Sequence, residues 1–441
     1  MTSNSSLKKI AFSGTVLTFF SYGSQQAIRF AGNLILTRLL EPELFGLMAL
    51  VTSLRVGIEL FSDFGTNQNI IQSEKGKDPK FYNTAWTIQV IRGFVLWGLS
   101  LLITFPLASF YQEDRLLIIF PIIGFTTVLD GFTSTSETLL RRDLKLGLVT
   151  ANRIGLRLVS LIITISWALV SPTIWALVAG TLSFAGIGIF SSHYLLPGPP
   201  NRFCLDQKTI ADIVNFGRWM FVATILFFLA SQADRLILAK VFSFELVGVY
   251  TIAYALANLP REVIKRISSQ VVFPLLSKRK GLPRQELRHK ISGARAKCLL
   301  IVALGLAPLT AFGDSLIGFL YDARYEDAEW MFSILCLGVW FSSLANIGTN
   351  TLLAFGKPKH NAYSYALRLI VISLGIYFGS MLFGVRGAIV AVALSDVFAY
   401  LGIQYGLFLE KITFLKQDLL MTVVYFSSVT CLLFFKQSMG W

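Results

Sequence analysis

Hydrophobic segments of about twenty residues recur along the whole chain, and this pattern limits the fold more than any other feature of the sequence. A segment of this length can cross the hydrocarbon core of a bilayer as an α-helix. The chain is 54% hydrophobic and only 15% charged, whereas a membrane β-barrel would show short alternating segments. The sequence therefore predicts an all-α integral membrane protein. Its expected spans are 13–37, 44–62, 84–108, 116–138, 148–170, 173–196, 213–238, 245–267, 298–320, 330–354, 362–383, 386–409 and 418–435.

The distribution of Lys and Arg between the predicted loops indicates the orientation of the chain. With the N-terminus in the cytoplasm, about 22 of these residues fall in cytoplasmic loops and about 6 on the other side. This asymmetry follows the positive-inside rule and accounts for the formal charge of +14 without nucleic acid as a partner. No small-residue cleavage site follows the first span, so we expect it to be retained and not removed as a signal peptide.

Two similar segments, 34–48 and 236–250, indicate an internal repeat because they align without gaps. Their matched charged and glycine positions are Arg38/Lys240, Glu43/Glu245 and Gly46/Gly248. Both copies end one predicted span and begin the next, and six spans separate them, so both face the same way. The pattern predicts two parallel six-helix lobes, 1–210 and 211–409, with an additional transmembrane helix in 410–441.

Short motifs in both halves carry a resemblance to a known family. In the first half they are Phe45-Gly46-Leu47, Ser62-Asp63-Phe64-Gly65 and Ile70-Ile71-Gln72. In the second half they are Phe216-Gly217, the run from Asp234 to Lys240, Gly248-Val249-Tyr250 and the run from Val272 to Lys278. Their order and spacing over nearly the whole chain resemble the polysaccharide transporter (Wzx-type) flippases. These flippases belong to a superfamily that also contains multidrug exporters.

The resemblance implies a MATE-like fold in which two lobes enclose a V-shaped cavity. It also implies translocation of undecaprenyl-pyrophosphate-linked oligosaccharide repeat units across a bacterial inner membrane, for exopolysaccharide, capsule or O-antigen assembly. The expected partners are the lipid-linked oligosaccharide, membrane lipid, a polysaccharide polymerase and export proteins. The cavity of this family is cationic, but its arginine positions vary, so the resemblance by itself assigns no binding residue.

Basic residues inside the predicted spans are the candidates for substrate binding. An arginine in the middle of a membrane costs about 2.5–3.5 kcal/mol, so it is expected in a water-filled cavity or beside a buried partner. The embedded cations are Arg29, Arg55, Arg92, Arg153, Arg157, Arg218, Arg235, Arg261, Lys265, Arg266 and Arg368. The guanidinium fork suits phosphate oxygens. We predict a substrate site that includes Arg29, Arg55, Arg153, Arg157 and Arg235. The cations expected nearer the cytoplasmic interface are Arg218, Arg261, Lys265, Arg266 and Arg368.

Acidic residues inside the spans need a separate explanation. Asp130 and Asp396 have no basic residue nearby in the sequence. Each therefore needs a cationic partner from another helix, or serves as an ion- or proton-coupling site. Arg55 and Glu59 are four residues apart, which predicts an ion pair within one helix. Arg153 and Arg157 have the same spacing and share a helix face, where an anion or water between them would reduce their repulsion.

Motifs for catalysis and for metal binding are absent from the sequence. The four cysteines and three histidines lack metal-ligand spacing, and no Walker A sequence is present. We expect no catalytic residue, metal or cofactor. Two alternatives stay open. One is a cation-coupled multidrug exporter of the same superfamily, although embedded basic residues outnumber embedded acids. The other is a membrane glycan polymerase, although the longest loop, roughly 277–297, is basic and lacks Asp.

Overall fold

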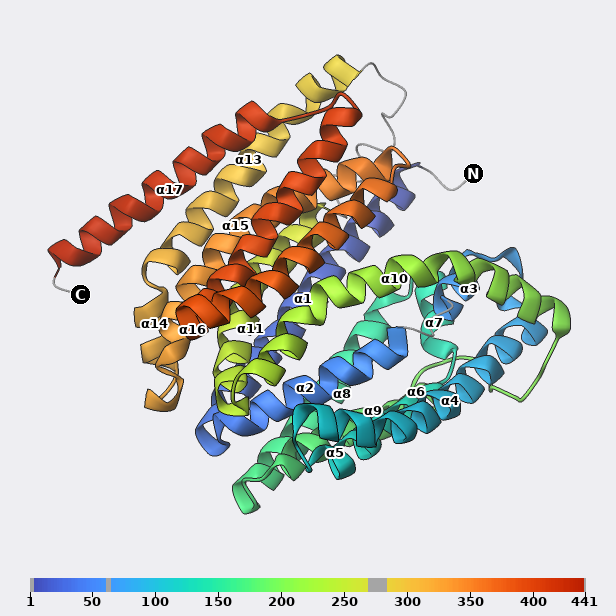
Figure 1. Ribbon diagram of the computed structural model, residues 1–441. Helices are drawn as coiled ribbons and strands as arrows, with labels where there is room; N and C mark the ends of the chain where they lie inside the picture. The colour runs from blue at the N-terminus through green and yellow to red at the C-terminus, as the bar shows by residue number, and fades with distance from the viewer. Residues whose placement is uncertain (1–3, 61–64, 269–283, 440–441) are drawn as a thin grey trace. The chain divides into compact units, whose positions relative to one another are not determined.

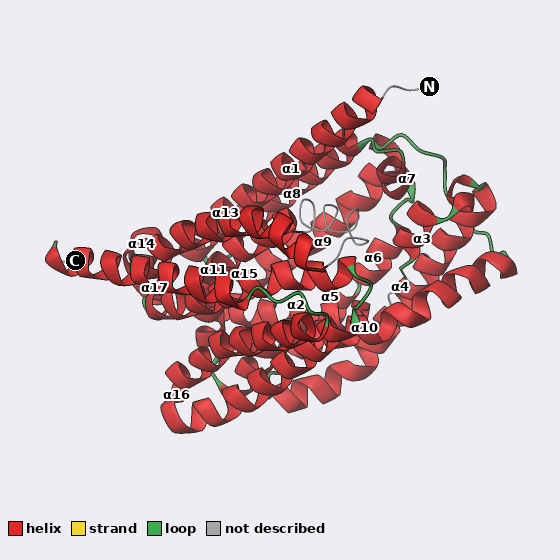
Figure 2. Ribbon diagram, turned by 90° about the horizontal axis from the view of Figure 1, so that it is seen from above, coloured by secondary structure: helices red, strands yellow, loops and turns green. Residues whose placement is uncertain are grey.

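Helices make up nearly all of the described part of the computed structural model, which covers residues 4–60, 65–268 and 284–439 (Figure 1). No strand occurs among these residues (Figure 2), as the sequence predicts. The elements are α1 (Asn4–Leu39), α2 (Pro42–Leu60), α3 (Thr66–Gln72), η1 (Glu74–Lys77), α4 (Pro79–Tyr111), α5 (Leu116–Gly124), α6 (Thr126–Phe132), α7 (Ser136–Arg142), α8 (Leu146–Val170), α9 (Ile174–Phe190), η2 (Ser191–Leu195), α10 (Gln207–Val241), α11 (Phe244–Ile267), α13 (Arg284–Ala311), α14 (Gly313–Leu320), η4 (Ala323–Tyr325), α15 (Asp327–Ala354), α16 (Lys359–Leu409) and α17 (Leu415–Ser438).

Many of these helices have the length and composition of membrane spans. Within the described residues, 7 helices are long and apolar enough to cross a membrane, or 8 if the bent pair Leu116–Phe132 and Ser136–Arg142 is one span. The 51-residue helix α16 holds two predicted spans, because Gly384 leaves the helical conformation with φ 60° and ψ −142°. Glycine adopts this backbone conformation at little steric cost. The break between the predicted spans 362–383 and 386–409 is thus confirmed.

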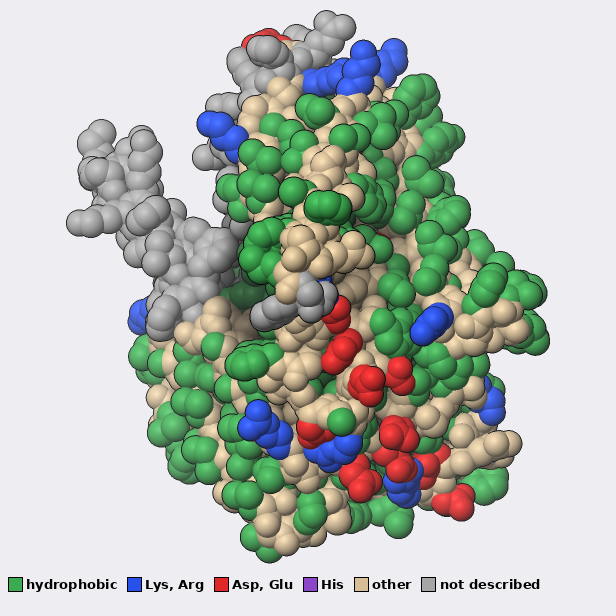
Figure 3. Space-filling model, turned by 90° about the vertical axis from the view of Figure 1, so that its left-hand side faces the viewer, with side chains coloured by type: hydrophobic (Ala, Val, Ile, Leu, Met, Phe, Trp, Pro, Cys, Tyr) green, Lys and Arg blue, Asp and Glu red, His purple; other side chains and the backbone are tan. Residues whose placement is uncertain are grey.

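The surface also has the character of a protein embedded in lipid. Large apolar side chains are exposed along the helices, with Leu102 at 76%, Phe319 at 84% and Phe434 at 74%. Hydrophobic side chains cover much of the face that Figure 3 shows. Exposure of this extent is unfavourable in water but favourable against acyl chains. The chain is a multi-pass membrane protein.

The first compact unit comprises residues 1–44 and 48–225. In this unit α1 lies against α8, α8 against α9, and α4 against α5 and α6. The contact between α4 and α6 is close because Gly93 has no side chain. A Cβ atom at this position would lie 2.5 Å from the carbonyl oxygen of Thr127. Because α4 and α6 approach closely at Gly93, the neighbouring Arg92 lies near the polar residues Thr127 and Asp130 of α6.

The second compact unit comprises residues 45–47 and 226–441. The helix α15 lies at its centre and contacts α11, α13, α14 and α16, while α13 also lies against α17 (Figure 1). Trp340 of α15 stacks on Tyr425 of α17, with ring centroids 4.8 Å apart. Both rings are buried. The C-terminal helix is therefore part of the core of this unit.

The two repeated segments occupy corresponding places in the chain. Residues 34–48 run from the end of α1 into α2, and residues 236–250 run from the end of α10 into α11. The predicted helix–turn–helix of each copy is confirmed. The boundary between the two compact units falls within α10, between Ile225 and Leu226. The parallel arrangement of two six-helix lobes, with boundaries at 1–210, 211–409 and 410–441, stays a prediction.

Several predicted features lie outside the described residues. They include the motif residues 62–64 and the motif run 272–278. They also include the predicted loop 277–297 as far as residue 283, and the side chains of Arg218 and Arg266. The rest of the predicted loop 277–297 is helical, because α13 begins at Arg284. The prediction of a loop up to Lys297 is therefore wrong for residues 284–297, where the helix extends well beyond its apolar part.

Candidate functional site

Arg55 is the centre of a polar cluster in the first unit. Its Nη1 atom donates hydrogen bonds to Thr126 Oγ1 at 2.8 Å and to Asp130 Oδ2 at 3.2 Å, both on α6. Its Nη2 atom lies 3.5 Å from Glu59 Oε2, which confirms the predicted pair within α2. The cationic partner that Asp130 was expected to need from another helix is therefore Arg55. The side chain of Arg55 is 20% exposed, so the cluster is only partly shielded from solvent.

A small polar cavity of about 170 Å³ adjoins this cluster. Arg92 on its wall donates a hydrogen bond from Nη2 to the carbonyl oxygen of Glu59 at 2.5 Å, and Gln89 donates to the carbonyl oxygen of Asp130 at 3.3 Å. The cavity is lined by Glu59, Leu60, Asn67, Gln68, Gln89, Arg92, Gly93, Leu96, Thr127, Asp130 and Gly131. Pockets for drug-sized ligands measure roughly 300–1,000 Å³. This cavity therefore has room for water or one small polar group, and an oligosaccharide does not fit.

The predicted pair on α8 separates into two environments. Arg153 donates from Nε to Glu137 Oε1 at 2.9 Å and is half exposed. Arg157, one turn further on, lies over the ring of Phe184 with its guanidinium carbon 5.8 Å from the centroid. Arg29 of α1 is exposed and close enough to Arg157 for charge repulsion. Arg153 shares the carboxylate of Glu137 with Arg141. Arg157 and Arg29 form a positive pair between α1 and α8.

Arg235 belongs to an aromatic cluster in the second unit. Its guanidinium carbon lies 4.6 Å from the centroid of the Tyr254 ring, and Nη1 donates to Gln232 Oε1 at 2.8 Å. The neighbouring carboxylate of Asp234 is buried and accepts a hydrogen bond from the hydroxyl of Tyr250. The charge of Arg235 is therefore balanced partly by an aromatic face and partly by a nearby acid.

Asp396 of α16 binds two arginines in the second unit. Its Oδ2 atom accepts a hydrogen bond from Nη2 of Arg261 on α11, and its Oδ1 atom lies 3.3 Å from Nε of Arg368. The side chains are 6% exposed for Asp396, 13% for Arg261 and 12% for Arg368. Both arginines are mostly shielded beside the acid, and their predicted position near the cytoplasmic interface stays a prediction. The three groups together carry one excess positive charge.

The predicted substrate site did not include Arg261 and Arg368, because both lie close to the ends of predicted spans. The signal that could have found them was Asp396, an embedded acid without a cation nearby in the sequence. A second buried pair, Arg295 with Asp418, joins α13 to α17. Its arginine was predicted to be a loop residue.

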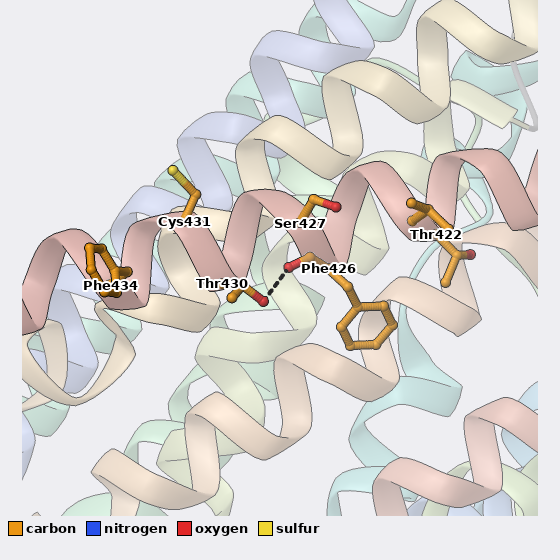
Figure 4. A pocket seen from close by; sticks show the side chains of 7 residues that line it. Thr422, Phe426, Ser427, Thr430, Cys431 and Phe434 are labelled. Carbon is orange, nitrogen blue, oxygen red and sulfur yellow. Dashed lines mark hydrogen bonds between the residues drawn. The ribbon is translucent and has the colours of Figure 1, made fainter.

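A surface depression lies on α17 and is open to the surroundings (Figure 4). Its volume is about 690 Å³, and all of its lining residues come from this helix, including Phe426, Cys431 and Phe434. It contains no Asp, Glu, Lys or Arg, so it offers nothing to a charged headgroup. Among the described residues, no group of three or more His, Cys, Asp or Glu could hold a metal ion.

Comparisons with known proteins agree with the sequence motifs. Residues 35–330 match the family described as polysaccharide biosynthesis protein. The teichuronic acid biosynthesis protein TuaB of Bacillus subtilis is 20% identical over 321 residues, which cover 72% of this chain and 66% of TuaB. The lipopolysaccharide biosynthesis protein WzxC of Escherichia coli is 20% identical over 359 residues, which cover 77% of this chain and 70% of WzxC. The chain thus spans about two thirds of the length of the first of these relatives.

Solved structures show the same fold. The lipid II flippase MurJ in an inward closed conformation aligns with a TM-score of 0.74 at 13% identity, covering 97% of this chain and 93% of MurJ. An inward-facing multidrug resistance MATE family transporter of the MOP superfamily aligns with a TM-score of 0.69 at 14% identity, covering 86% of this chain and 93% of the transporter. These likenesses confirm the predicted MATE-like fold.

Proposed function

Since the chain belongs to the polysaccharide biosynthesis protein family, we propose that it is a flippase for undecaprenyl-pyrophosphate-linked oligosaccharide. It carries the repeat unit from the cytoplasmic to the outer face of a bacterial inner membrane by alternating access. The membrane-spanning helices and the MATE-like fold support a carrier. Relatives named for the biosynthesis of teichuronic acid and lipopolysaccharide support a glycan cargo.

Arginine side chains held inside the helical units are the observation that carries this proposal. A pyrophosphate diester is an anion with many acceptor oxygens, and guanidinium groups bind such oxygens in pairs. This attraction is stronger in a poorly hydrated interior than in water. Arg55 supports the proposal in the first unit, because Thr126 and Asp130 of α6 hold its guanidinium inside the helices. The proposed substrate residues are Arg29, Arg55, Arg153, Arg157 and Arg235, to which the structure adds Arg261 and Arg368 as candidates.

The source of energy for transport is proposed to be an ion gradient or the membrane potential. Asp130 is the candidate coupling residue in the first unit, although its bond to Arg55 weakens its attraction for a cation. If Asp130 binds the coupling ion, Asp130→Asn abolishes gradient-driven transport and leaves substrate binding largely intact. Transport that keeps its gradient dependence in this variant assigns Asp130 a structural role.

The orientation follows from the positive-inside rule, with the N-terminus and residues 278–297 in the cytoplasm. A cysteine introduced at Glu286, in a chain without its four native cysteines, should resist an impermeant thiol reagent on intact cells. A cysteine at Arg324, on the predicted outer side, should be labelled. The reverse pattern would invert the orientation of the chain.

Export of glycan to the cell surface tests the function. In a strain that lacks the native flippase, Arg29→Ala and Arg55→Ala should block export while the protein stays in the membrane. Arg→Lys should restore export only partly, because it keeps the charge and loses the fork. Arg324→Ala is the matched control, since this exposed arginine of η4 pairs with Asp322 at the start of that short helix. Arg218→Ala should matter less than the first two changes.

The result that contradicts the proposal is full export by the Arg29 and Arg55 alanine variants, alone and combined. Loss of the Arg55 variant from the membrane has a different meaning, because Arg55 also links α2 to α6. Protein abundance, measured in parallel, separates the two cases. The Arg55→Lys variant keeps a charge beside Asp130 and so reports on substrate binding in a folded protein.

A cation-coupled multidrug exporter is the second candidate, and the acids Glu59 and Asp130 beside one cavity favour it. Such a carrier would need to bind cations, whereas the second unit places two arginines on one carboxylate. Efflux of ethidium from cells that express the protein would support this reading. Glycan export without ethidium efflux would exclude it.

A further inference from the structure

The arginine pair in the second unit is already occupied by a carboxylate that belongs to the protein. Asp396 uses one oxygen for Arg261 and places the other within ion-pair distance of Arg368. Arg368 and Asp396 lie on opposite sides of the break at Gly384, and Arg261 comes from α11. One carboxylate therefore ties together three helical segments that meet inside the unit.

The hydrogen-bond inventory shows that this carboxylate does not satisfy the arginines. Two guanidinium groups present about ten N–H donors, whereas one carboxylate offers about four lone-pair sites. The Nε atom of Arg261 is buried without a hydrogen-bond partner, and the Nε atom of Arg368 lies 3.3 Å from Asp396 Oδ1 without hydrogen-bond geometry. Unsatisfied buried donors destabilise the state that contains them, so a better acceptor at this place is favoured.

The charge of the cluster leads to the same conclusion. Arg261 and Arg368 with Asp396 keep one excess positive charge, because the other nearby acid, Asp234, is matched by Arg235. An excess charge is costly where water is scarce. Without Asp396 the two guanidinium groups would repel each other and the cost would be higher. A carrier that runs through an empty state needs an anion at this place when no substrate is bound. Asp396 has the charge and the position for it.

We infer that Asp396 is an internal substitute for the substrate phosphate, an inference that rests on the proposed function. In the empty carrier Asp396 holds Arg261 and Arg368. The pyrophosphate of the lipid-linked substrate displaces it, because a pyrophosphate offers more acceptor oxygens in the same region. Asp396 returns to the arginines when the substrate leaves. The exchange breaks the bonds that join the second part of α16 to α11 and to the first part of α16, so substrate binding favours a different packing of these segments.

Binding to the purified protein in lipid nanodiscs tests the inference. The probe is farnesyl diphosphate, and farnesol is the control without a phosphate. The wild-type protein should bind farnesyl diphosphate more tightly than farnesol. Asp396→Asn should bind farnesyl diphosphate about tenfold more tightly than the wild type, because the amide competes poorly for the arginines. Farnesol affinity should stay the same. Asp314→Asn, which removes an acid paired with Lys436, should not change either affinity.

Additional variants separate this role from a purely structural one. Arg261→Gln and Arg368→Gln should each remove the gain in affinity when combined with Asp396→Asn. Asp396→Asn should also slow glycan export although it binds the probe better, because the competing carboxylate no longer helps to release the anion. If the ion pair of Asp396 with the two arginines is only structural, Asp396→Asn should lower the abundance of the protein and should not raise its affinity for farnesyl diphosphate.

Asp396→Asn removes the carboxylate that pairs with Arg261 and Arg368, so the variant is expected to be less stable, and a second measurement uses this loss of stability. Inorganic pyrophosphate should raise the melting temperature of this variant more than that of the wild type or of Asp314→Asn. The inference is overturned if pyrophosphate gives no preferential stabilisation, or if the folded variant shows equal or weaker affinity. Unchanged affinity with loss of gradient dependence would assign Asp396 to ion coupling and overturn the inference as well.

The experiment also distinguishes this inference from the proposed function. A wild-type protein that prefers farnesyl diphosphate to farnesol, with no gain in Asp396→Asn, retains the function and rejects the role of Asp396. If the wild-type protein does not prefer farnesyl diphosphate to farnesol, it has no anion site of this kind. That result contradicts both the proposed function and the role of Asp396.

Discussion

The buried ion pair between Arg295 and Asp418 provides the sharpest test of how α17 is held in the second unit. The two side chains are 2% and 1% exposed. Arg295 also donates from Nη1 to Gln417 Oε1 at 2.8 Å and lies over the ring of Phe414, 4.8 Å from its centroid. Because neither side chain reaches water, solvent screens the attraction between them very little. The pair should behave as a fully buried one.

The magnitude follows from what each substitution leaves behind. Asp418→Asn keeps an oxygen for its other donors but leaves the Arg295 charge unpaired, which costs about 3–5 kcal/mol. Arg295→Met leaves Asp418 with hydrogen bonds from Gln404 at 2.6 Å and Tyr400 at 3.1 Å, so its cost should lie near the lower end of this range. The double variant buries no unpaired charge. It should lose only about 1–2 kcal/mol, from hydrogen bonds.

Unfolding of the purified protein by SDS titration, for the wild type, both single variants and the double variant, measures these losses. The coupling energy of the cycle should be roughly 3 kcal/mol or more. Raising the salt concentration from about 0.1 M to about 1 M should change it little, because buried pairs are poorly screened. Asp322→Asn is the control, since the Arg324–Asp322 pair is 39% and 40% exposed and should be worth less than about 1 kcal/mol. Single losses below about 1 kcal/mol, or additive losses in the double variant, would refute the reasoning.

Three further predictions address the fold and its loops. Gly384→Val should destabilise the break in α16 by about 1–3 kcal/mol, because a β-branched residue at φ 60° is strained, and the midpoint of SDS unfolding would show it. A hydrogen bond from Arg115, opposed by partial burial, lowers the pKa of Glu113 below its ordinary value of 4.5. Since a lowered carboxyl pKa stabilises the folded state above the ordinary value, the difference in melting temperature between the wild type and Glu113→Gln should be largest near neutral pH and should shrink as the pH falls below 4.5 toward the lowered pKa of the folded state. Lys436→Met should lower the melting temperature by no more than a few degrees, because its partner Asp314 is 45% exposed, and a larger loss would contradict this estimate of the pair.

The membrane class and the local features of this protein follow from the sequence alone. Long apolar runs predict spanning helices because a bilayer core demands about twenty residues of helix, whatever the neighbours are. The pair of Arg55 and Glu59 is predictable because residues four apart always share a helix face. The break near Gly384 is likewise local, since it follows from a short interruption between two apolar runs.

The partners of the embedded acids were decided only by the tertiary structure. Asp130 meets Arg55 across 75 residues of sequence, and Asp396 meets Arg261 across 135 residues. Which arginine reaches which acid depends on the helices that lie side by side and on how each is rotated, and hydropathy carries no information on rotation. Arg295 shows the same limit, because its charge suggested a loop while the facing Asp418 permits it to be buried in a helix. The sequence determined that these charges lie among membrane helices, and the packing of the helices determined which of them neutralise one another.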